Sequence, residues 1–547
     1  MKNILVVSIL IFLFVHNFHS QEIQINWSEK VRRFFLGDGT FNKYVGETDK
    51  YVYATFLRSN KVNLIQFEKK EMLKADSYRV RGFKENFRNI FRFVKHTYLN
   101  TIITDSNIFV FWNRMRIGTY FKKEKVYVTC YDHSFNLKYK NREIYSYEHT
   151  LFTTPSKKHE KTSLFVFYNP GYSQNILVGS EQKGVRKVTV NYTLFSGKLD
   201  RISDFSNDFF HNDRQLLTSS YTISHLPGDK ILVKQYCPII YTENLIKKLL
   251  KFRHDNTPHL ACTYFSVINT RDGKEKSYPL SDHTRLMHDV SFDVLGNKLL
   301  FSGGWNDYVK NPYGDSLTGY FYATIQGDEF IASHLNQVRF EKSQLDSIYG
   351  SKSVKSEEGL FVKYLFQKEK ELLENIPTVE KGVFTSDSSI AIVTSNTFFD
   401  VMDPYSTEKV YYSQHFFKRN INVMNINLRN DKVIWNKEIK RNVTYYNPFI
   451  NDISIFRKDS SLFMFYGDGD FSTKDIPLHS LVNEKTQLGH AVVNLKDGKY
   501  KSHLTLLDHK SMFPGEIYEL NKSYYLRGFK YQWIPLYWSS FFGRITF

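Results

Sequence analysis

The segment Ile421–Ile439 has the alternating pattern of a short β-hairpin. A polar stretch, Arg429–Lys432, divides it into two runs in which apolar and polar residues alternate. Its regularly spaced apolar residues are Met424, Ile426, Leu428, Val433 and Trp435. Alternation with a period of two indicates a strand with one buried face, and Asn and Asp favour a tight turn between two such strands. The pattern therefore predicts a hairpin.

The same hairpin pattern recurs along the chain. In the clearest copies, two alternating strands flank a short turn that contains Asn, Asp or Gly. These residues adopt positive φ at the smallest cost, so the combination is a strong local signal for a hairpin. The clear copies are Val188–Ile202, Cys262–Leu280, Gly319–Ser333 and Gly489–Leu504, and the looser copies are Asn63–Ala75 and Val126–Lys140.

A second recurring element is a polar turn followed by a short apolar strand. These strands are apolar along most of their length, so we expect both of their faces to be buried. The hairpin strands alternate more strictly, so we expect each of them to keep one face in contact with water. The copies of this element begin at Asp49, Ser106, Thr162, Gly228, Gly296, Asp387, Asp459 and Asn521.

Eight such modules predict an all-β fold, a β-propeller of eight blades, or of seven if one module is an insertion. A small sheet cannot cover its own two faces, whereas sheets stacked around an axis cover one another. The last module, from Asn521, leaves room for one more strand before Phe547 but not for a full hairpin. We expect the missing outer strand to come from Gln21–Trp27, so that the N- and C-terminal strands together close the ring.

Two insertions interrupt the modules. Apolar residues at helical spacing predict a short helix at 243–253, and a segment rich in helix formers within 340–376 predicts another that stops before Pro377. Such an insertion caps the central opening, forms a partner surface or is inert packing, and the sequence leaves these alternatives open. With these insertions, residues 21–547 are expected to form a single propeller domain.

The first twenty residues have the features of a secretory signal peptide. Lys2 precedes an apolar run from Ile4 to Val15, and Ser20 is a suitable small residue before the cleavage site. The run is shorter than the roughly 20 residues of a membrane-spanning helix, and we find no later run of about 18 apolar residues. We therefore expect an exported chain, periplasmic or extracellular, with no membrane span once the signal is removed.

The formal net charge of +18 suggests an anionic partner. The lysines are scattered along the chain, however, and the abundance of Phe, Tyr, Asn and Ile is typical of an AT-rich genome, which also raises the lysine content. A specific nucleic-acid partner would require a clustered basic face or a known motif, and neither is present. The partners that remain open are a protein or an anionic glycan at the cell envelope.

The three cysteines are Cys130, Cys237 and Cys262. A chain of this length does not need disulfides for stability, so we interpret all three as small buried apolar residues. The alternative is a disulfide between Cys237 and Cys262 that leaves Cys130 free.

Several stretches share a pattern of strand, turn and aromatic residues. They are VIWNKEIKRN from Val433, the pair Tyr445 and Tyr446, SLFMFYGDGD from Ser461, LLFSGGW from Leu299 and GYFYATI from Gly319. In these stretches, within residues 290–340 and 420–545, the chain resembles a family of uncharacterised exported β-propeller-like proteins of Gram-negative bacteria. The resemblance implies the fold and the export route. Because that family has no known activity, the resemblance implies no catalytic residue.

Two groups of residues are candidate metal ligands. Asp468 and Asp470 are separated by one glycine after a buried strand, as at the start of a Ca²⁺ loop, although the distal Glu of such a loop is absent. His283, His288 and Asp289 have donors that suit Zn²⁺, without a third strong ligand nearby in the sequence. The alternative is a solvated turn for the two aspartates and a structural or surface role for the histidine group. A third polar group, interpreted in the same way, is Asp204, Asp208, His211 and Asp213.

No catalytic motif stands out. The chain has no G-x-S-x-G elbow, no H-E-x-x-H and no phosphate-binding loop, so we assign no catalytic residue and no cofactor. The expected function is that of a non-catalytic binding or scaffold protein, with its ligand on a rim of the ring. One alternative is a propeller enzyme acting on extracellular glycans or other small substrates, which requires a pair of carboxylates. A second is an outer-membrane β-barrel, suggested by the alternating tail that ends in Phe547.

Overall fold

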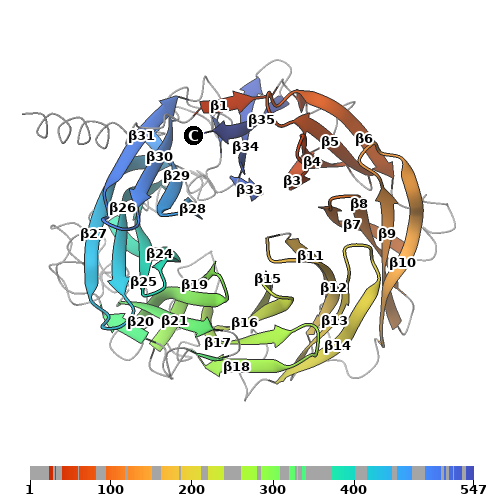
Figure 1. The fold of residues 1–547 in the computed structure, drawn as a ribbon, viewed down its shortest axis with the longest axis horizontal. Coiled ribbons are helices and arrows are strands. Elements are labelled where there is room, and N and C mark those ends of the chain that lie inside the picture. Colours follow the sequence, from red (N-terminus) through yellow and green to blue (C-terminus); the bar gives the residue numbers. More distant parts are fainter. Residues whose placement is uncertain are drawn as a thin grey trace, which may run out of the picture.

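The computed structural model shows an all-β chain that forms a ring of eight blades around a central axis (Figure 1). No helix occurs among the residues that the structure describes. The described residues are 24–28, 31–32, 40–58, 61–81, 94–117, 121–150, 162–169, 171–183, 187–210, 220–238, 260–279, 285–307, 319–326, 329–330, 336–339, 373–400, 415–445, 453–470, 487–506, 511–512, 517–520, 523–532 and 537–546.

Each blade is an antiparallel sheet whose first strand lies nearest the ring axis and whose last strand lies on the outside. Blades 1 and 2 are β3 (Thr40–Glu47), β4 (Tyr51–Arg58), β5 (Lys61–Glu68) and β6 (Lys74–Arg81), then β7 (Val94–Ile103), β8 (Ile108–Ile117), β9 (Phe121–Tyr131) and β10 (Leu137–Thr150). Blades 3 and 4 are β11 (Thr162–Asn169), β12 (Ser173–Lys183), β13 (Lys187–Phe195) and β14 (Arg201–Phe210), then β15 (Ser220–Leu226), β16 (Lys230–Pro238), β17 (Leu260–Asn269) and β18 (Glu275–Pro279).

The second half of the ring follows the same plan. Blades 5 and 6 are β19 (Arg285–Leu295), β20 (Lys298–Asp307), β21 (Gly319–Gln326) and the short β22 (Glu329–Phe330) and β23 (Asn336–Arg339), then β24 (Leu373–Ser386), β25 (Ser389–Asp400), β26 (His415–Asn427) and β27 (Val433–Tyr445). Blade 7 is β28 (Ser454–Lys458), β29 (Ser461–Asp470), β30 (Gln487–Asn494) and β31 (Tyr500–Leu506). Blade 8 is β32 (Ser511–Met512), β33 (Tyr518–Leu520), β34 (Ser523–Gln532) and β35 (Tyr537–Thr546), with β1 (Gln24–Trp27) and β2 (Val31–Arg32).

The predicted modules correspond to blades. The seven predicted hairpins are the third and fourth strands of blades 1 to 7, and seven of the eight predicted apolar strands are second strands. The exception is the strand from Thr162, which is β11, the first strand of blade 3. The second strand of that blade is β12, which begins at Ser173. Both strands contain a short apolar run, so only their pairing distinguishes them.

In blades 1 and 5, the first strand of the predicted hairpin, which is the third strand of its blade, is more buried than the alternation predicted. Strand β21 is buried along its whole length except for its last residue, and β5 is exposed only partly, at its two ends. A third strand pairs with another strand along each edge and packs against another blade on each face, so neither face is open to water. The prediction does hold for the outer strands, where Ile434, Asn436, Glu438 and Lys440 of β27 are exposed at alternate positions.

A common turn joins the third and fourth strands in blades 4, 6 and 7. The side-chain Oδ1 of Asn269, Asn427 and Asn494 accepts a hydrogen bond from the amide two residues later, at 3.0, 2.8 and 2.9 Å. The residue four positions after each Asn has a φ of 71°, 58° and 69°. The amide that directly follows each Asn donates to a carbonyl of the first turn in the same blade, at 2.9 Å in all three. In these three blades, a hydrogen bond therefore joins the two turns at one end of the ring.

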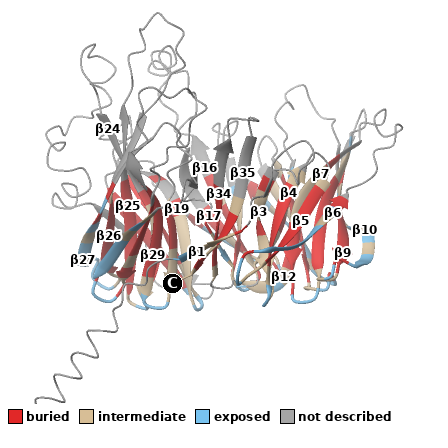
Figure 2. Ribbon diagram, turned by 90° about the horizontal axis from the view of Figure 1, so that it is seen from above, coloured by how far each residue is buried: buried red, intermediate tan, exposed pale blue. Residues whose placement is uncertain are grey.

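The hydrophobic core lies between the blades. The described residues form eight apolar clusters, and each cluster combines side chains from two neighbouring blades. Strand β4 shows how this arises, because Val52 and Ala54 pack toward blade 8 while Tyr53 packs toward blade 2. Figure 2 shows how burial varies along the ring axis, with buried residues in the middle of the strands and exposed residues at the tight turns. The blades therefore cover one another, as predicted.

The two ends of the chain meet in blade 8, as the sequence predicted. Strand β1 pairs with β35 in antiparallel register, with Gln24 opposite Thr546 and Trp27 opposite Gly543 (Figure 1). Because β35 would otherwise be the outer edge of the last blade, the N-terminal strand supplies the fourth strand of that blade.

Polar contacts between blades 8 and 1 support this closure. The Tyr525 hydroxyl donates to Oε2 of Glu47 at 2.6 Å, and the Lys69 ammonium lies 3.2 Å from the same oxygen. The Tyr44 hydroxyl donates to the carbonyl of Leu526 at 2.9 Å. The Glu47 side chain is only 1% exposed, so these donors hold a buried carboxylate at the seam of the ring.

The second predicted insertion differs in part from the expected helix. Strand β24 begins at Leu373, so the prediction of a helix reaching Pro377 is wrong for residues 373–376. Pro377 lies inside β24, which pairs only with β25, and an edge strand tolerates a residue without an N–H. The predicted helix at 243–253 and residues 340–372 lie outside the described part of the chain.

Residues 1–20, which were predicted to be the signal peptide, also lie outside the described part. Within the residues that the structure describes, we find no helix with the length and apolar character needed to cross a membrane.

Candidate functional site

The first strands of the blades surround the ring axis (Figure 1). Each is the inner edge strand of its blade and pairs with the second strand of that blade; β19 makes one further pair with β17 of blade 4, where Met287 is opposite Cys262. An edge strand leaves backbone carbonyls without a ladder partner, and these groups need donors from elsewhere. In blades 6 and 7, the basic side chains Lys381 and Arg457 of the first strands supply such donors.

We call four charged residues of the first strands the axial cluster: Asp293 of β19, Lys381 of β24, Arg457 of β28 and Glu519 of β33. Blades 5, 6, 7 and 8 each contribute one of them. Glu519 is exposed, and the other three are partly buried, so water reaches this side of the ring. Two acidic and two basic groups make the cluster neutral in sum.

Arg457 and Asp293 make contacts that join three blades. The Arg457 guanidinium donates to the carbonyls of Phe384 in blade 6 and Val294 in blade 5, at 3.1 and 2.7 Å. Asp293 accepts a hydrogen bond from the Phe384 amide at 2.8 Å, and its Oδ2 lies 3.8 Å from Nη1 of Arg457. This pair therefore closes the inner edge of blades 5, 6 and 7, and a structural role accounts for its contacts.

Lys381 and Glu519 keep more of their bonding capacity. The Lys381 ammonium donates to the carbonyl of Ile455 at 3.1 Å, and Lys381 and Glu519 form no ion pair with any residue in the described part of the chain. Burial lowers the pKa of Lys381, while the charges of Asp293 and Glu519 oppose this effect. Protein atoms around Glu519 raise its pKa despite its contact with water, and Lys381 opposes that effect. Both charges are thus partly desolvated.

Two further side chains, Tyr172 of blade 3 and His225 of blade 4, lie close to one another. Burial raises the pKa of the Tyr172 phenol, and the negative charges of Asp293 and Glu519 raise it further. Since such charges act over about 10 Å, Tyr172 lies near the axial cluster although it belongs to another part of the ring. The imidazole of His225 lies 5.9 Å from the Tyr172 ring, and burial lowers its pKa. The axial region therefore combines charged groups with aromatic ones.

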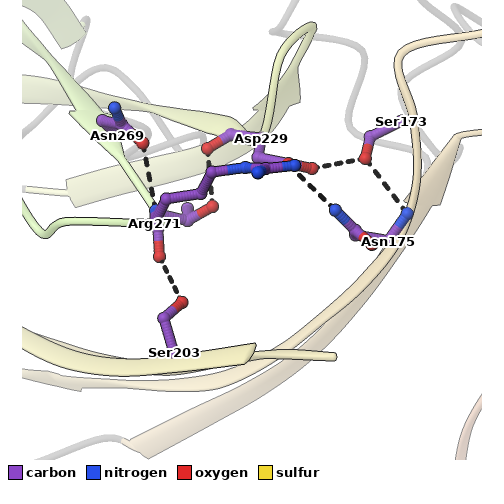
Figure 3. A network of polar contacts seen from close by, with 7 residues as sticks. Ser173, Asn175, Ser203, Asp229, Asn269 and Arg271 are labelled. Atoms are coloured by element: carbon purple, nitrogen blue, oxygen red, sulfur yellow. Dashed lines mark hydrogen bonds and ion pairs between the residues drawn. The ribbon is translucent and has the colours of Figure 1, made fainter. Parts of the chain in front are cut away.

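A second polar network lies between blades 3 and 4 (Figure 3). Oδ2 of Asp229 accepts hydrogen bonds from Asn175 at 2.9 Å and from Nε of Arg271 at 2.7 Å, and its Oδ1 accepts one from Ser173. Burial by itself would raise the pKa of Asp229, but these donors outweigh burial and lower it. Its backbone carbonyl also accepts from the amide and hydroxyl of Thr270, at 2.9 and 2.5 Å.

The bonds from Ser173 and Asn175 to Asp229 join blade 3 to blade 4, whereas those from Thr270 and Arg271 link two turns within blade 4. The Asp229 side chain is only 4% exposed and has donors at both oxygens, so it has no capacity left for a ligand. We therefore interpret the network as a structural link rather than as a site.

The structure places the backbone of four of the five candidate metal ligands. Asp468 and Asp470 lie at the end of β29 in blade 7, where Asp468 is opposite Gln487. His288 and Asp289 lie in β19 of blade 5, with His288 opposite Gly304, and His283 lies outside the described residues. Among the described residues, no group of three or more His, Cys, Asp or Glu side chains is placed to hold a metal ion. A metal role for the five candidate residues stays a prediction.

The third polar group is partly placed. Asp204 and Asp208 lie on β14 at the outside of blade 3, where each accepts a hydrogen bond from a threonine of β13, at 2.6 Å in both. These are cross-strand contacts of a surface sheet. His211 and Asp213 of the same group lie outside the described residues.

The structure confirms that Cys130 is buried and free. Cys237 of β16 is opposite Ala261, and Cys262 of β17 is opposite Tyr236, so these two cysteines are in neighbouring strands without being directly opposite one another. Their possible disulfide stays a prediction. Tyr445 ends β27, and Tyr446 lies outside the described residues.

Sequence reasoning missed all four residues of the axial cluster. They belong to first strands, which are short or irregular in pattern, such as SIFRK in β28 and YEL in β33. A usable signal was present: each of these strands directly precedes a predicted apolar strand and the tight turn that begins it. A charge at such a position would mark a residue on the inner edge of a blade.

Comparisons with known proteins give no family for this chain. No protein-family model matches the chain, and no curated protein matches it. The chain is similar to the WD40 domain of SCAP from fission yeast, with 9% identity, a TM-score of 0.35 and coverage of 95% of this chain and 98% of that one. It is also similar to the β-propeller domain of the Trilobed protease from Pyrococcus furiosus, with 12% identity, a TM-score of 0.31 and coverage of 86% and 99%.

A third similar structure is an oligogalacturonate lyase in complex with manganese, with 8% identity, a TM-score of 0.31 and coverage of 92% of this chain and 98% of that one. Likenesses this distant carry no argument about the function of this chain.

Proposed function

We propose that the protein is a non-catalytic binding or scaffold protein that is exported and acts in the periplasm or outside the cell. The export rests on the signal-like residues 1–20 and on the resemblance to exported propeller-like proteins. The binding role rests on one structural observation, the difference between the two ends of the ring.

The two ends of the ring carry connections of very different length. Turns from first to second strands and from third to fourth strands meet at one end, and all of those between described strands are tight. The other connections join strands at the opposite end and include 239–259, 340–372, 401–414 and 471–486. Long connections positioned by a rigid scaffold are where binding residues concentrate. We therefore assign the ligand or partner to that end.

The test replaces two long connections and leaves the ring intact. A variant in which 401–414 and 471–486 are each replaced by Asn-Gly should retain the thermal stability of the wild type but lose binding to envelope glycans or envelope proteins. The matched control changes the opposite end, by Lys274→Gln and Lys499→Gln in two exposed turns. Retained binding in the first variant, or lost binding in the control, would contradict the assignment.

Export needs its own experiment. Expression in a Gram-negative host should place the chain in the periplasmic or extracellular fraction, and removal of residues 2–20 should leave it in the cytoplasm. A full-length chain found only in the cytoplasm would refute the export part of the proposal.

A second candidate function is an enzyme acting on extracellular glycans or other small substrates. The observation that favours it is the pair of carboxylates Asp293 and Glu519 on the axial side, where the charge of Asp293 adds to the effect of burial that raises the pKa of Glu519. Glycosidic cleavage uses two carboxyl groups about 5 to 10 Å apart. Cleavage of a glycan that Asp293→Asn and Glu519→Gln each abolish would favour the enzyme. The binding proposal expects the glycan to stay intact.

A further inference from the structure

Lys381 and Glu519 approach the same strand, β28, from its two sides. Lys381 is opposite Val393 in its sheet, and Val393 packs in the core between blades 6 and 7, so the Lys381 side chain is directed toward blade 7. Its hydrogen bond to the Ile455 carbonyl of β28 confirms this direction.

Glu519 approaches β28 from blade 8. Its neighbours in β33, Tyr518 and Leu520, both pack against the apolar cluster shared with blade 1. Side chains alternate along a strand, so Glu519 is directed to the other side, toward blade 7. The influence that Lys381 and Glu519 exert on each other agrees with this placement.

The two charges are near one another without forming a contact. An ion pair would bring a nitrogen and an oxygen within about 4 Å, and the described residues form no such pair with Lys381 or Glu519. The other two members of the axial cluster, Arg457 and Asp293, already have partners. Lys381 keeps its hydrogen bond to Ile455 and Glu519 interacts with Tyr524, so what these two charges lack among the described residues is an ion-pair partner, with the cation on one side of β28 and the anion on the other.

We propose that Lys381 and Glu519 bind a small zwitterionic molecule, whose carboxylate contacts the Lys381 ammonium and whose ammonium contacts the Glu519 carboxylate. Charge-assisted hydrogen bonds are roughly twice as strong as neutral ones, and a zwitterion makes one at each end. A ligand with a single charge satisfies one residue and leaves the other without a counter-ion. The proposal deepens the binding function above and rests on it, but it places this ligand at the axis rather than at the long connections.

The test measures the affinity of the full chain for a series of ω-amino acids of increasing length, from glycine to 6-aminohexanoate, by isothermal titration calorimetry. Because Lys381 and Glu519 are fixed on two strands, one chain length should bind best. The alkylamine and the alkanoate of that length should each bind at least about tenfold more weakly. Equal binding by a singly charged analogue, or equal binding of all lengths, would overturn the proposal.

Substitutions identify the site. Glu519→Gln and Lys381→Met should each weaken binding of the best ω-amino acid by at least about tenfold, and Lys274→Met in an exposed turn should not change it. Glu519 is exposed, so Glu519→Gln is expected to fold even if Lys381→Met does not. Wild-type affinity in Glu519→Gln would overturn the proposal.

These experiments distinguish failure of the zwitterion site from failure of the proposed binding function. The variant with shortened connections at 401–414 and 471–486 should still bind the ω-amino acid, and Glu519→Gln should still bind the envelope partner. If no ω-amino acid binds while the envelope partner does, the proposed zwitterion site is wrong and the binding function stands. If an ω-amino acid binds and no envelope partner does, the proposed function is wrong instead.

Discussion

The imidazole of His490 gives a quantitative prediction about stability and pH. His490 lies on β30 in blade 7, is fully buried, and has the rings of Phe463 and Phe465 at 6.2 and 5.3 Å. Burial lowers its pKa from 6.5 to about 4, and the positive charge of His503 contributes in the same direction. The folded protein therefore resists protonation of this ring, whereas the unfolded chain does not.

The sign and the size follow from proton linkage. Because the folded-state pKa is below the unfolded one, the contribution of His490 is fully present above pH 6.5 and is lost as the pH falls toward 4. Each pH unit between the two values costs about 1.4 kcal/mol, so the whole loss is about 3 kcal/mol. At pH 4.5, most of it, about 2.5 kcal/mol, should already be lost.

The assay is urea denaturation at pH 7.5 and at pH 4.5, for the wild type and for His490→Leu. Other titrating groups are the same in both proteins and cancel in the comparison. The free energy of unfolding of His490→Leu should fall by about 2.5 kcal/mol less than that of the wild type between the two pH values. Val492→Ala, on the same strand, is the control and should show the wild-type pH dependence. Equal pH dependence in wild type and His490→Leu would refute the reasoning.

Three further substitutions test contacts between blades, each by urea denaturation at pH 7.5. Asp229→Ala should lower the free energy of unfolding by about 3 kcal/mol, because the buried donors around it lose their acceptor, and a loss below about 0.5 kcal/mol would show that the network is not structural. Tyr525→Phe should cost about 1 to 2 kcal/mol by removing a donor from buried Glu47, and no change would argue against that contact. Gly498→Ala should lower the free energy of unfolding by about 1 to 3 kcal/mol more than Gly296→Ala. Both glycines have positive φ, but only at Gly498 would a Cβ meet a neighbouring side chain, that of Trp435 at 2.6 Å. Equal losses in the two variants would contradict this packing.

The sequence predicted the fold because the propeller repeats a local pattern. Each hairpin and each apolar strand is readable from about ten neighbouring residues, and the repeats gave the number of blades and the closure by Gln21–Trp27. The third strands were harder, because the polar residues of β5, such as Asn63 and Gln66, suggest a wet face although both are buried. Their burial depends on the neighbouring blade, which no local pattern contains.

The axial cluster could not be predicted for a similar reason. Asp293 and Glu519 are far apart in sequence and lie in strands too short or irregular to be recognised. They come together only because a ring places the first strands of all blades around one axis. The acidic and histidine groups that the sequence does show, such as Asp468 with Asp470, are neighbours along the chain, which is why a sequence pattern can identify them.

The central claim is that the blades stabilise one another in a ring that the two chain ends close. The most direct test is thermal unfolding, followed by circular dichroism, of a variant that lacks residues 21–30 and so lacks β1. We predict that the whole chain melts in one transition at a clearly lower temperature, because loss of β1 uncovers β35 and opens the seam between blades 8 and 1. An unchanged melting temperature would contradict the closed ring.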